Sequence, residues 1–157
     1  MKRLVESFKE FITSSEIHQN PGAWDYYGSN PRRSLGSTEK VSFPELKVSS
    51  IKAKIDTGAD GTSIDANDIK VKNGVLSFWI KSPSNRLEFS KFDKVKVKNS
   101  SGKSEDRYRI RTMLKIGNDE IRVQVSLTDR GNMKFPCIIG KNAITKGKYM
   151  VDLNGKR

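Results

Sequence analysis

A carboxylate, a small hydroxyl and a glycine stand in a row at Asp56, Thr57 and Gly58, directly after an alternating apolar run at 48–55. Asp and Gly are common in turns, so the triplet alone favours a charged surface turn. The same residues could also present a catalytic carboxylate, because a positioned acid can take a proton from water. The rest of the chain has to decide between these two interpretations.

Peptide hydrolysis by carboxylates uses water as the nucleophile and needs a second carboxyl group to polarise the carbonyl. Two carboxyls held about 3 Å apart cannot easily both ionise, so they share one proton. The sequence holds a single D-T-G triplet, so one chain supplies half of such a pair. If both carboxyls of the pair come from this triplet, a catalytic Asp56 requires a homodimer, in which a two-fold axis brings the side chain against its own copy.

The elements around Asp56 have the pattern of an all-β domain. Short or alternating apolar runs predict strands, and segments rich in Gly, Asn and Asp predict the turns. The predicted strands are 48–55, 75–80, 92–98, 107–116, 120–127, 135–139 and 149–153, with one helical turn at 143–146. Many short strands joined by turns indicate a barrel or a sandwich.

The first 40 residues differ from this pattern. Apolar side chains at helical spacing in 3–12 predict a short amphipathic helix. Residues 14–40 are polar and rich in Gly, Pro, Ser and Asn, which indicates an extended arm. We therefore divide the chain into a helix with a polar arm at 1–40 and a β domain at 41–157.

A later segment strengthens the catalytic interpretation. CIIGKNAI, at 137–144, follows IDTGAD in an order that resembles the retropepsin-type aspartic proteases. In that fold a strand delivers D-T-G-A to the active site, and an apolar-apolar-Gly segment with a short helix packs beneath it. The resemblance implies a retropepsin-like closed acid-protease barrel.

The likeness covers 41–153 within one bacterial and phage branch. That branch is often labelled an ATP-dependent zinc protease family and is associated with a ribosomal-protein glutamate ligase. FPELKVSSIKAKIDTGA, RIRTMLKIG and VSLTDRGNMKFPCIIGKNAI carry the resemblance. The chain departs from the branch at Asp60, where a basic residue is common, and at Asp65, near a common histidine. It also has GKN for GRN, so Asp60 and Lys141 form a compensated pair with a poorer partner than Arg.

The resemblance implies that Asp56 is catalytic and that its neighbours support it. Thr57 would hydrogen-bond across the two-fold axis, and Gly58 would let the backbone approach closely and present its N–H. The residues that would line the floor of the cleft or pack under the loop are Ala59, Asp60, Ile139, Gly140 and Lys141.

The same resemblance implies a flap, a hairpin that closes over the substrate, within KVKVKNSSGKSEDRYRIR. Its tip would consist of Asn99, Ser100, Ser101, Gly102 and Lys103. A flap tip with one glycine rather than several leaves the gating of substrate open.

The charge balance of the chain indicates which kinds of partner it could bind. Lys and Arg number 30 against 18 Asp and Glu, a formal net charge of +12. Such an excess favours a polyanion, either nucleic acid, an acidic protein surface or an acidic polypeptide substrate, although a well-solvated surface is the alternative. Lys94, Lys96 and Lys98 share one strand face without the aromatic pattern of an RNA-binding sheet, so nucleic-acid binding rests on charge alone.

Other chemistries find little support. The sequence has no H-E-x-x-H, no phosphate-binding glycine loop and a single histidine, His18, in the polar arm. We therefore expect no metal, no ATP and no other cofactor. The one cysteine, Cys137, is expected to be a buried small hydrophobe and allows no internal disulfide. No apolar run reaches the roughly 20 residues of a membrane helix, and no signal peptide opens the chain, so we expect a cytoplasmic protein.

A second function stays open. MKRLVESFKEFI resembles the N-terminal segments of head-associated proteins of T4-like phages. The β domain would then be a non-catalytic structural or assembly module of a phage head, neck or tail, in contact with virion proteins, because a fold does not fix a function. Such a module would not need an Asp56 pair.

Overall fold

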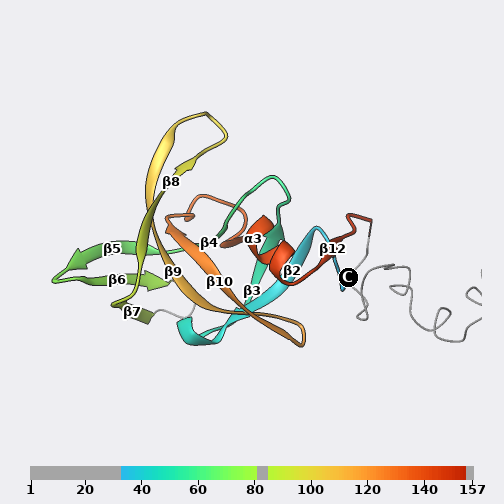
Figure 1. Ribbon diagram of the computed structural model, residues 1–157, viewed down its shortest axis with the longest axis horizontal. Coiled ribbons are helices and arrows are strands. Elements are labelled where there is room, and N and C mark those ends of the chain that lie inside the picture. Colours follow the sequence, from blue (N-terminus) through green and yellow to red (C-terminus); the bar gives the residue numbers. More distant parts are fainter. Residues whose placement is uncertain (1–32, 81–84, 155–157) are drawn as a thin grey trace, which may run out of the picture.

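The computed structural model describes residues 33–80 and 85–154 (Figure 1). The predicted helix at 3–12, His18 and residues 14–32 of the polar arm lie outside these residues. Strands predominate and include a closed six-stranded barrel, so the predicted all-β barrel is confirmed. None of the helices in 33–80 and 85–154 combines the length and the apolar character that crossing a membrane requires.

The strands, in chain order, are β1 (Ser34–Leu35), β2 (Thr38–Phe43), β3 (Val48–Ile55), β4 (Thr62–Asp65), β5 (Asn67–Lys72), β6 (Val75–Ile80), β7 (Asn85–Phe89), β8 (Asp93–Lys98), β9 (Ser104–Ile116), β10 (Asp119–Thr128), β11 (Cys137–Ile139) and β12 (Met150–Val151). A 3-10 turn, η2 (Pro44–Leu46), and a short helix, α3 (Lys141–Lys146), complete the described elements. The predicted strands and helical turn are all present, with shifted ends in most cases, and β1 and β2 begin inside the segment that the sequence assigned to the arm.

The barrel arises from one long sheet with the strand order β10-β4-β11-β3-β2-β9-β8. An additional pairing of β9 with β10 closes six of these strands into a ring, and β8 continues outward from β9 as a hairpin (Figure 1). The separate sheet of β5, β6 and β7 projects to one side of the barrel. The β8–β9 hairpin lies where the sequence placed the flap.

Two short pairings of β11 position the site. The strand β11 lies between β3, to which it is parallel, and β4, to which it is antiparallel. The chain that joins β3 to β4, residues 56–61, therefore passes across the end of β11. This crossing brings the D-T-G triplet onto the apolar-apolar-Gly segment.

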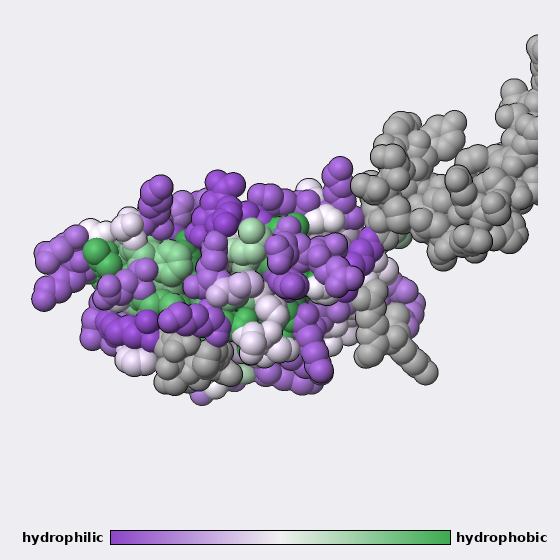
Figure 2. Space-filling view, turned by 90° about the horizontal axis from the view of Figure 1, so that it is seen from below, coloured by the Kyte–Doolittle hydropathy of each residue, from purple (hydrophilic) through white to green (hydrophobic). Residues whose placement is uncertain are grey.

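The core of the barrel consists of the inward side chains of these alternating strands. Its fully buried members include Phe43, Ile64, Ile110, Leu114, Ile116, Leu127 and Ile139, each at most 1% exposed. Burying one such side chain contributes about 1.5–3 kcal/mol, so the strand ends that carry the site are held by the core rather than by local turns. The outer surface is mostly hydrophilic on the face drawn in Figure 2, with apolar groups visible only in patches.

Candidate active site

Asp56 is the first residue after β3. Its backbone N–H donates to the carbonyl of Ile139 at 2.9 Å, which continues the pairing of Ile55 with Ile139. The two segments that the sequence placed in one site are therefore in direct contact. Because both β3 and β11 end at this point, Asp56 stands at the mouth of the barrel sheet and not inside it.

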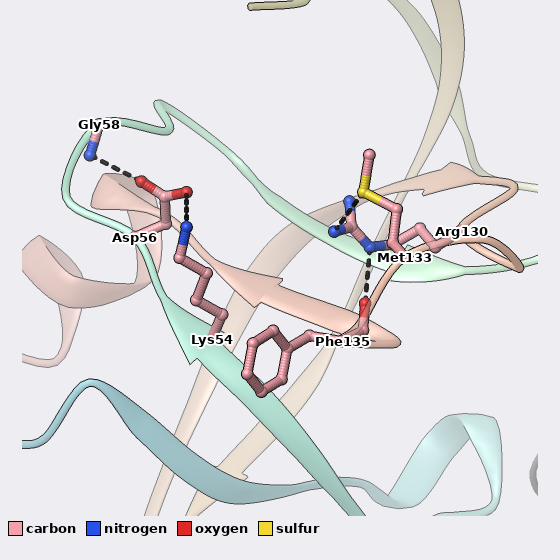
Figure 3. Close-up of polar contacts among 6 residues, drawn as sticks. All are labelled: Lys54, Asp56, Gly58, Arg130, Met133 and Phe135. Atoms are coloured by element: carbon pink, nitrogen blue, oxygen red, sulfur yellow. Dashed lines mark hydrogen bonds and ion pairs between the residues drawn. The ribbon is translucent and has the colours of Figure 1, made fainter.

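The carboxylate of Asp56 is held by its own loop (Figure 3). The Gly58 N–H donates to Oδ1 at 3.0 Å, and Lys54 Nζ lies 3.4 Å from Oδ2. The Ala59 N–H donates to the backbone carbonyl of Asp56 at 3.2 Å, which closes the turn. The side chain is still 27% exposed, so the carboxylate is oriented and accessible.

The loop rests on Gly140 and on the start of α3. The Lys141 N–H donates to the carbonyl of Ala59 at 2.8 Å, and the Asn142 N–H donates to that of Asp60 at 3.1 Å. The first N–H groups of a helix have no partner within the helix, so the loop carbonyls satisfy them. The helix start and the D-T-G loop thus stabilise each other.

The predicted pair of Asp60 and Lys141 is present, with Nζ 3.0 Å from Oδ1. The Asp60 side chain is 95% exposed, so the pair is screened by water and adds little to stability. Thr57 is exposed and makes no hydrogen bond within the described residues of this single chain. Its hydroxyl is available to a partner.

A polar network behind the loop was not predicted. The Gly140 N–H donates to Thr62 Oγ1 at 3.3 Å, and that hydroxyl donates to Asn142 Oδ1 at 2.8 Å. Asn142 Nδ2 in turn donates to the carbonyl of Gln124 at 2.8 Å. The network joins β4, β10 and α3 under the loop. The position of Asn142 in the GKN segment was the only signal in the sequence that pointed to it.

The tip of the β8–β9 hairpin is the segment predicted as the flap tip. The Gly102 N–H donates to the backbone carbonyl of Asn99 at 3.0 Å. The Lys103 N–H donates to the side-chain Oδ1 of Asn99 at 2.9 Å. Gly102 has φ of 81°, a conformation that favours glycine. All five tip residues are exposed, including Ser100 and Ser101. The hairpin is present, and its closure over a substrate stays a prediction.

Arg130 was also missed, although it lies within a quoted block. It stands on the loop 129–136 between β10 and β11, and its side chain is buried, with the residue 8% exposed. Burial lowers the pKa of its guanidinium below the ordinary value, and Asp56 and Asp65 are close enough to oppose this shift. A second cationic group therefore faces the neighbourhood of Asp56 (Figure 3).

Two other candidate chemistries can be compared with the geometry. Cys137 is fully buried, and burial raises the pKa of its thiol to about 12, so it is not poised as a nucleophile. Among residues 33–80 and 85–154, no group of three or more His, Cys, Asp or Glu side chains is arranged to hold a metal ion.

A depression of about 300 Å³, whose lining does not include Asp56, lies beside α3 and β10. It is lined by Arg111, Arg122, Val123, Gln124, Asn142 and Lys146. The depression holds no acid or nucleophile, whereas Asp56 combines an oriented carboxylate with the two sequence motifs. We therefore take Asp56 and its loop as the candidate active site.

The sequence profile of a family described as "RimB-like: Retropepsin-like aspartic endopeptidase RimB" matches residues 34–157. Among solved structures, the chain resembles Lpg0085 of Legionella pneumophila, a protein of unknown function, with a TM-score of 0.63 and 26% identity. That match covers 79% of this chain and 95% of the Legionella chain.

Curated relatives share the same region. A "Probable alpha-L-glutamate ligase" of Desulfotalea psychrophila is 33% identical over 123 residues, which is 72% of this chain and 26% of the relative. A protein of the same name from Shewanella pealeana is 30% identical over 128 residues, 75% of this chain and 28% of the relative. The chain thus spans about a quarter of the length of these curated relatives. These bacterial matches do not support the phage origin expected from the N-terminal segment.

Proposed function

This chain belongs to the RimB-like family of retropepsin-like aspartic endopeptidases, and on that premise we propose that it hydrolyses peptide bonds as a homodimer with one Asp56 from each subunit. The observation that carries the proposal is the Asp56 carboxylate itself. It is oriented by Gly58, anchored through Ile139 and 27% exposed, in a chain with a single D-T-G triplet. A lone carboxylate cannot perform this chemistry, so a second copy has to complete the pair.

In the proposed reaction the two Asp56 side chains share one proton. The ionised carboxylate removes a proton from water, and the oxygen of that water forms a bond to the carbonyl carbon of the substrate. The protonated carboxyl donates its proton to the carbonyl oxygen, which gives a tetrahedral diol. The C–N bond then breaks as a proton passes from the pair to the leaving nitrogen, and one hydroxyl of the diol returns a proton to the pair. The products are a carboxylic acid and an amine, and the pair again holds one proton.

The neighbouring residues fit supporting roles. The exposed Thr57 hydroxyl is suited to a hydrogen bond with its counterpart across the axis, and the β8–β9 hairpin is suited to cover a bound peptide. The Gly140 N–H and the start of α3 hold the loop from below.

The substrate that we propose is an acidic polypeptide. The formal charge of +12 attracts polyanions and raises their encounter rate. The curated relatives are named as glutamate ligases, and a region shared with such proteins is suited to a polypeptide that contains glutamate.

The test is an Asp56→Asn variant assayed against acidic peptides. We expect hydrolysis to be lost while the fold, read by circular dichroism and thermal melting, is kept. The matched control is Asp68→Asn, which removes the same charge from β5 outside the site and should keep full activity. Hydrolysis that survives in Asp56→Asn would exclude the mechanism.

A mixing experiment tests the shared dyad directly. Equal amounts of wild-type and Asp56→Asn subunits, allowed to exchange, give about one quarter dimers with two intact carboxyls. Activity per total protein should fall to about one quarter if the pair is required, but to only about one half if each subunit acts alone. Sedimentation at assay concentration must show a dimer, and an active monomer would contradict the proposal.

A further inference from the structure

The loop 129–136, which leads from β10 back to β11, is fixed at both ends by one buried acid. The Arg130 N–H donates to Asp65 Oδ1 at 2.7 Å, and the Asp65 N–H donates to the carbonyl of Pro136 at 2.7 Å. Asp65 is 8% exposed. Arg130 is thus placed by the barrel and not by a freely moving turn, which is what a recognition residue requires.

The guanidinium of Arg130 has hydrogen-bonding capacity that the protein does not use. Its Nε donates to the carbonyl of Phe135 at 3.0 Å, and Nη2 lies 3.3 Å from the thioether of Met133, a weak acceptor (Figure 3). Within 33–80 and 85–154, Nη1 donates to no acceptor. In that part of the chain, the side-chain nitrogen and oxygen atoms that are both fully buried and without a hydrogen-bond partner are Asn67 Nδ2 and Tyr149 Oη. Arg130 Nη1 has no partner but is not one of these atoms, so it is in contact with solvent.

Within 33–80 and 85–154, Arg130 also forms no ion pair, although Asp65 and Asp56 attract its charge from a greater distance. Five other described arginines form ion pairs with carboxylates, and all of them are more exposed: Arg33, Arg86, Arg107, Arg109 and Arg122. Arg130 is the buried arginine of the described chain, and no carboxylate there lies within ion-pair distance of it. A buried guanidinium stays protonated and normally has a paired anion, because an unpaired charge loses hydration without compensation.

We propose that Arg130 binds a carboxylate of the substrate beside Asp56 and so makes the cleft selective for an acidic residue near the scissile bond. The inference rests on the proposed peptidase function and adds to it a named specificity residue. The carboxylate would accept from Nη1 and displace the thioether from Nη2, which gives the two-pronged pairing that arginine favours. Met133 is 63% exposed and free to turn away. The Nε contact with Phe135 would remain and hold the fork in place.

This selectivity differs from the general attraction of a basic surface for acids. Surface charge raises the affinity for every acidic peptide in a salt-dependent way, whereas Arg130 would recognise an acidic residue at a single position of the peptide. An acidic peptide that wild-type protein cleaves is therefore compared with versions in which each Glu is replaced in turn by Gln. One position near the cut should lower kcat/KM by about tenfold to a hundredfold, as expected for a lost charge-assisted hydrogen bond. A version amidated at its C-terminus distinguishes a side-chain carboxylate from the terminal one.

The variants are Arg130→Met, which keeps the length but removes the charge, and Arg130→Lys, which keeps the charge but removes the fork. Arg130→Met should abolish the penalty at that one position, and Arg130→Lys should keep part of it. Arg111→Met is the matched control, because Arg111 is an exposed arginine outside the site, and it should leave the positional penalty unchanged. A penalty that persists in Arg130→Met, or an equal loss on all peptides with both Arg130 variants, overturns the proposal.

Peptide binding separates this inference from the proposed function. An acidic Glu-containing peptide, chosen without regard to cleavage, and its versions with each Glu replaced in turn by Gln are titrated calorimetrically into Asp56→Asn protein with and without Arg130→Met. A Glu-over-Gln preference that depends on Arg130 supports the inference even if wild-type protein cleaves nothing, which would contradict the peptidase function alone. Absence of binding, or binding with no dependence on Arg130, overturns the inference.

Discussion

Gly140 lies so close to Gly61 that a Cβ atom on Gly140 would be 2.3 Å from the Gly61 carbonyl oxygen. The same Cβ would be 2.8 Å from the carbonyl oxygen of Ala59. The contact exists because the chain from β3 to β4 has to cross the end of β11. Only a residue without a side chain allows this crossing, so the last position of the apolar-apolar-Gly segment requires glycine for steric reasons.

A Gly140→Ala variant should therefore displace the loop that carries Asp56. Overpacking of this kind costs about 1–3 kcal/mol, and we expect kcat/KM to fall by about a hundredfold because the carboxylate moves with the loop. Gly61→Ala is the matched control, since a Cβ there meets nothing within 4 Å, and it should keep its stability. Thermal melting and peptide assays on both variants decide the point. Normal activity in Gly140→Ala would show that the loop yields without consequence.

The sequence predicted the parts of the fold in which apolar pattern and burial coincide. The alternation in β3, β9 and β10 corresponds to side chains that enter the core, so these strands were recognised. The strand β4 was missed because it reads Thr-Ser-Ile-Asp, yet all four residues are buried between neighbouring strands. The strand β5 was missed for the opposite reason, since most of its side chains are exposed.

The sequence predicted those residues of the candidate site whose type is dictated by the local course of the backbone. Asp56, Gly58 and Gly140 fall in this class, because the turn and the crossing select them. Asp65 and Arg130 do not, because a polar residue in a turn-rich segment looks solvated in the sequence. Only the pairing of β10 with β4, and the return of the chain to β11, buries both residues and brings the Asp65 carboxylate to the Arg130 N–H.

Glu45 offers a test of stability against pH. It lies on η2 and accepts a hydrogen bond of 2.8 Å from Arg122 on β10. It also accepts from the Thr112 hydroxyl and the Met113 N–H on β9, both at 3.0 Å. The hydrogen bond from Arg122 is the main reason that the pKa of Glu45 lies below its ordinary value, and burial opposes it. The carboxylate therefore stabilises the fold above its unfolded-state pKa, and this contribution is lost as pH falls through the lower folded-state pKa.

Glu45→Gln should lower the free energy of unfolding near neutral pH by about 1 kcal/mol, a value reduced for solvent because the side chain is 39% exposed. The difference from wild type should shrink as the pH falls through the unfolded-state pKa of Glu45 and vanish below its lower folded-state pKa. Glu120→Gln is the charge-matched control, because its ion pair with Lys115 is long, at 3.7 Å, and the side chain is 56% exposed. Urea titrations at several pH values measure both. A pH-independent difference would contradict the assigned cause.

Cys137 gives a direct probe of barrel closure. Its thiol is fully buried, with a pKa raised to about 12 by burial, so the reactive thiolate is scarce in mildly alkaline buffer. Native protein should not react with a disulfide reagent such as DTNB, and unfolded protein should react fully. Cys137→Ala should retain peptidase activity and lose about 1–2 kcal/mol of stability through the small cavity. Rapid labelling of the native state, or loss of activity in Cys137→Ala, would reopen a role for the thiol.

The predicted flap can be tested with two glycines that share a left-handed backbone conformation. Gly102 at the tip of the β8–β9 hairpin has φ of 81°, and Gly74 at the tip of the β5–β6 hairpin has φ of 74°. A Cβ at either position meets nothing within 4 Å, so alanine introduces backbone strain of about 1 kcal/mol at each and no clash. Both variants should therefore melt at similarly lowered temperatures. If the β8–β9 hairpin covers the substrate, only Gly102→Ala should change KM and kcat, by several-fold, because it alters the tip that must close. Equal kinetics in the two variants would mean that the hairpin does not gate the cleft.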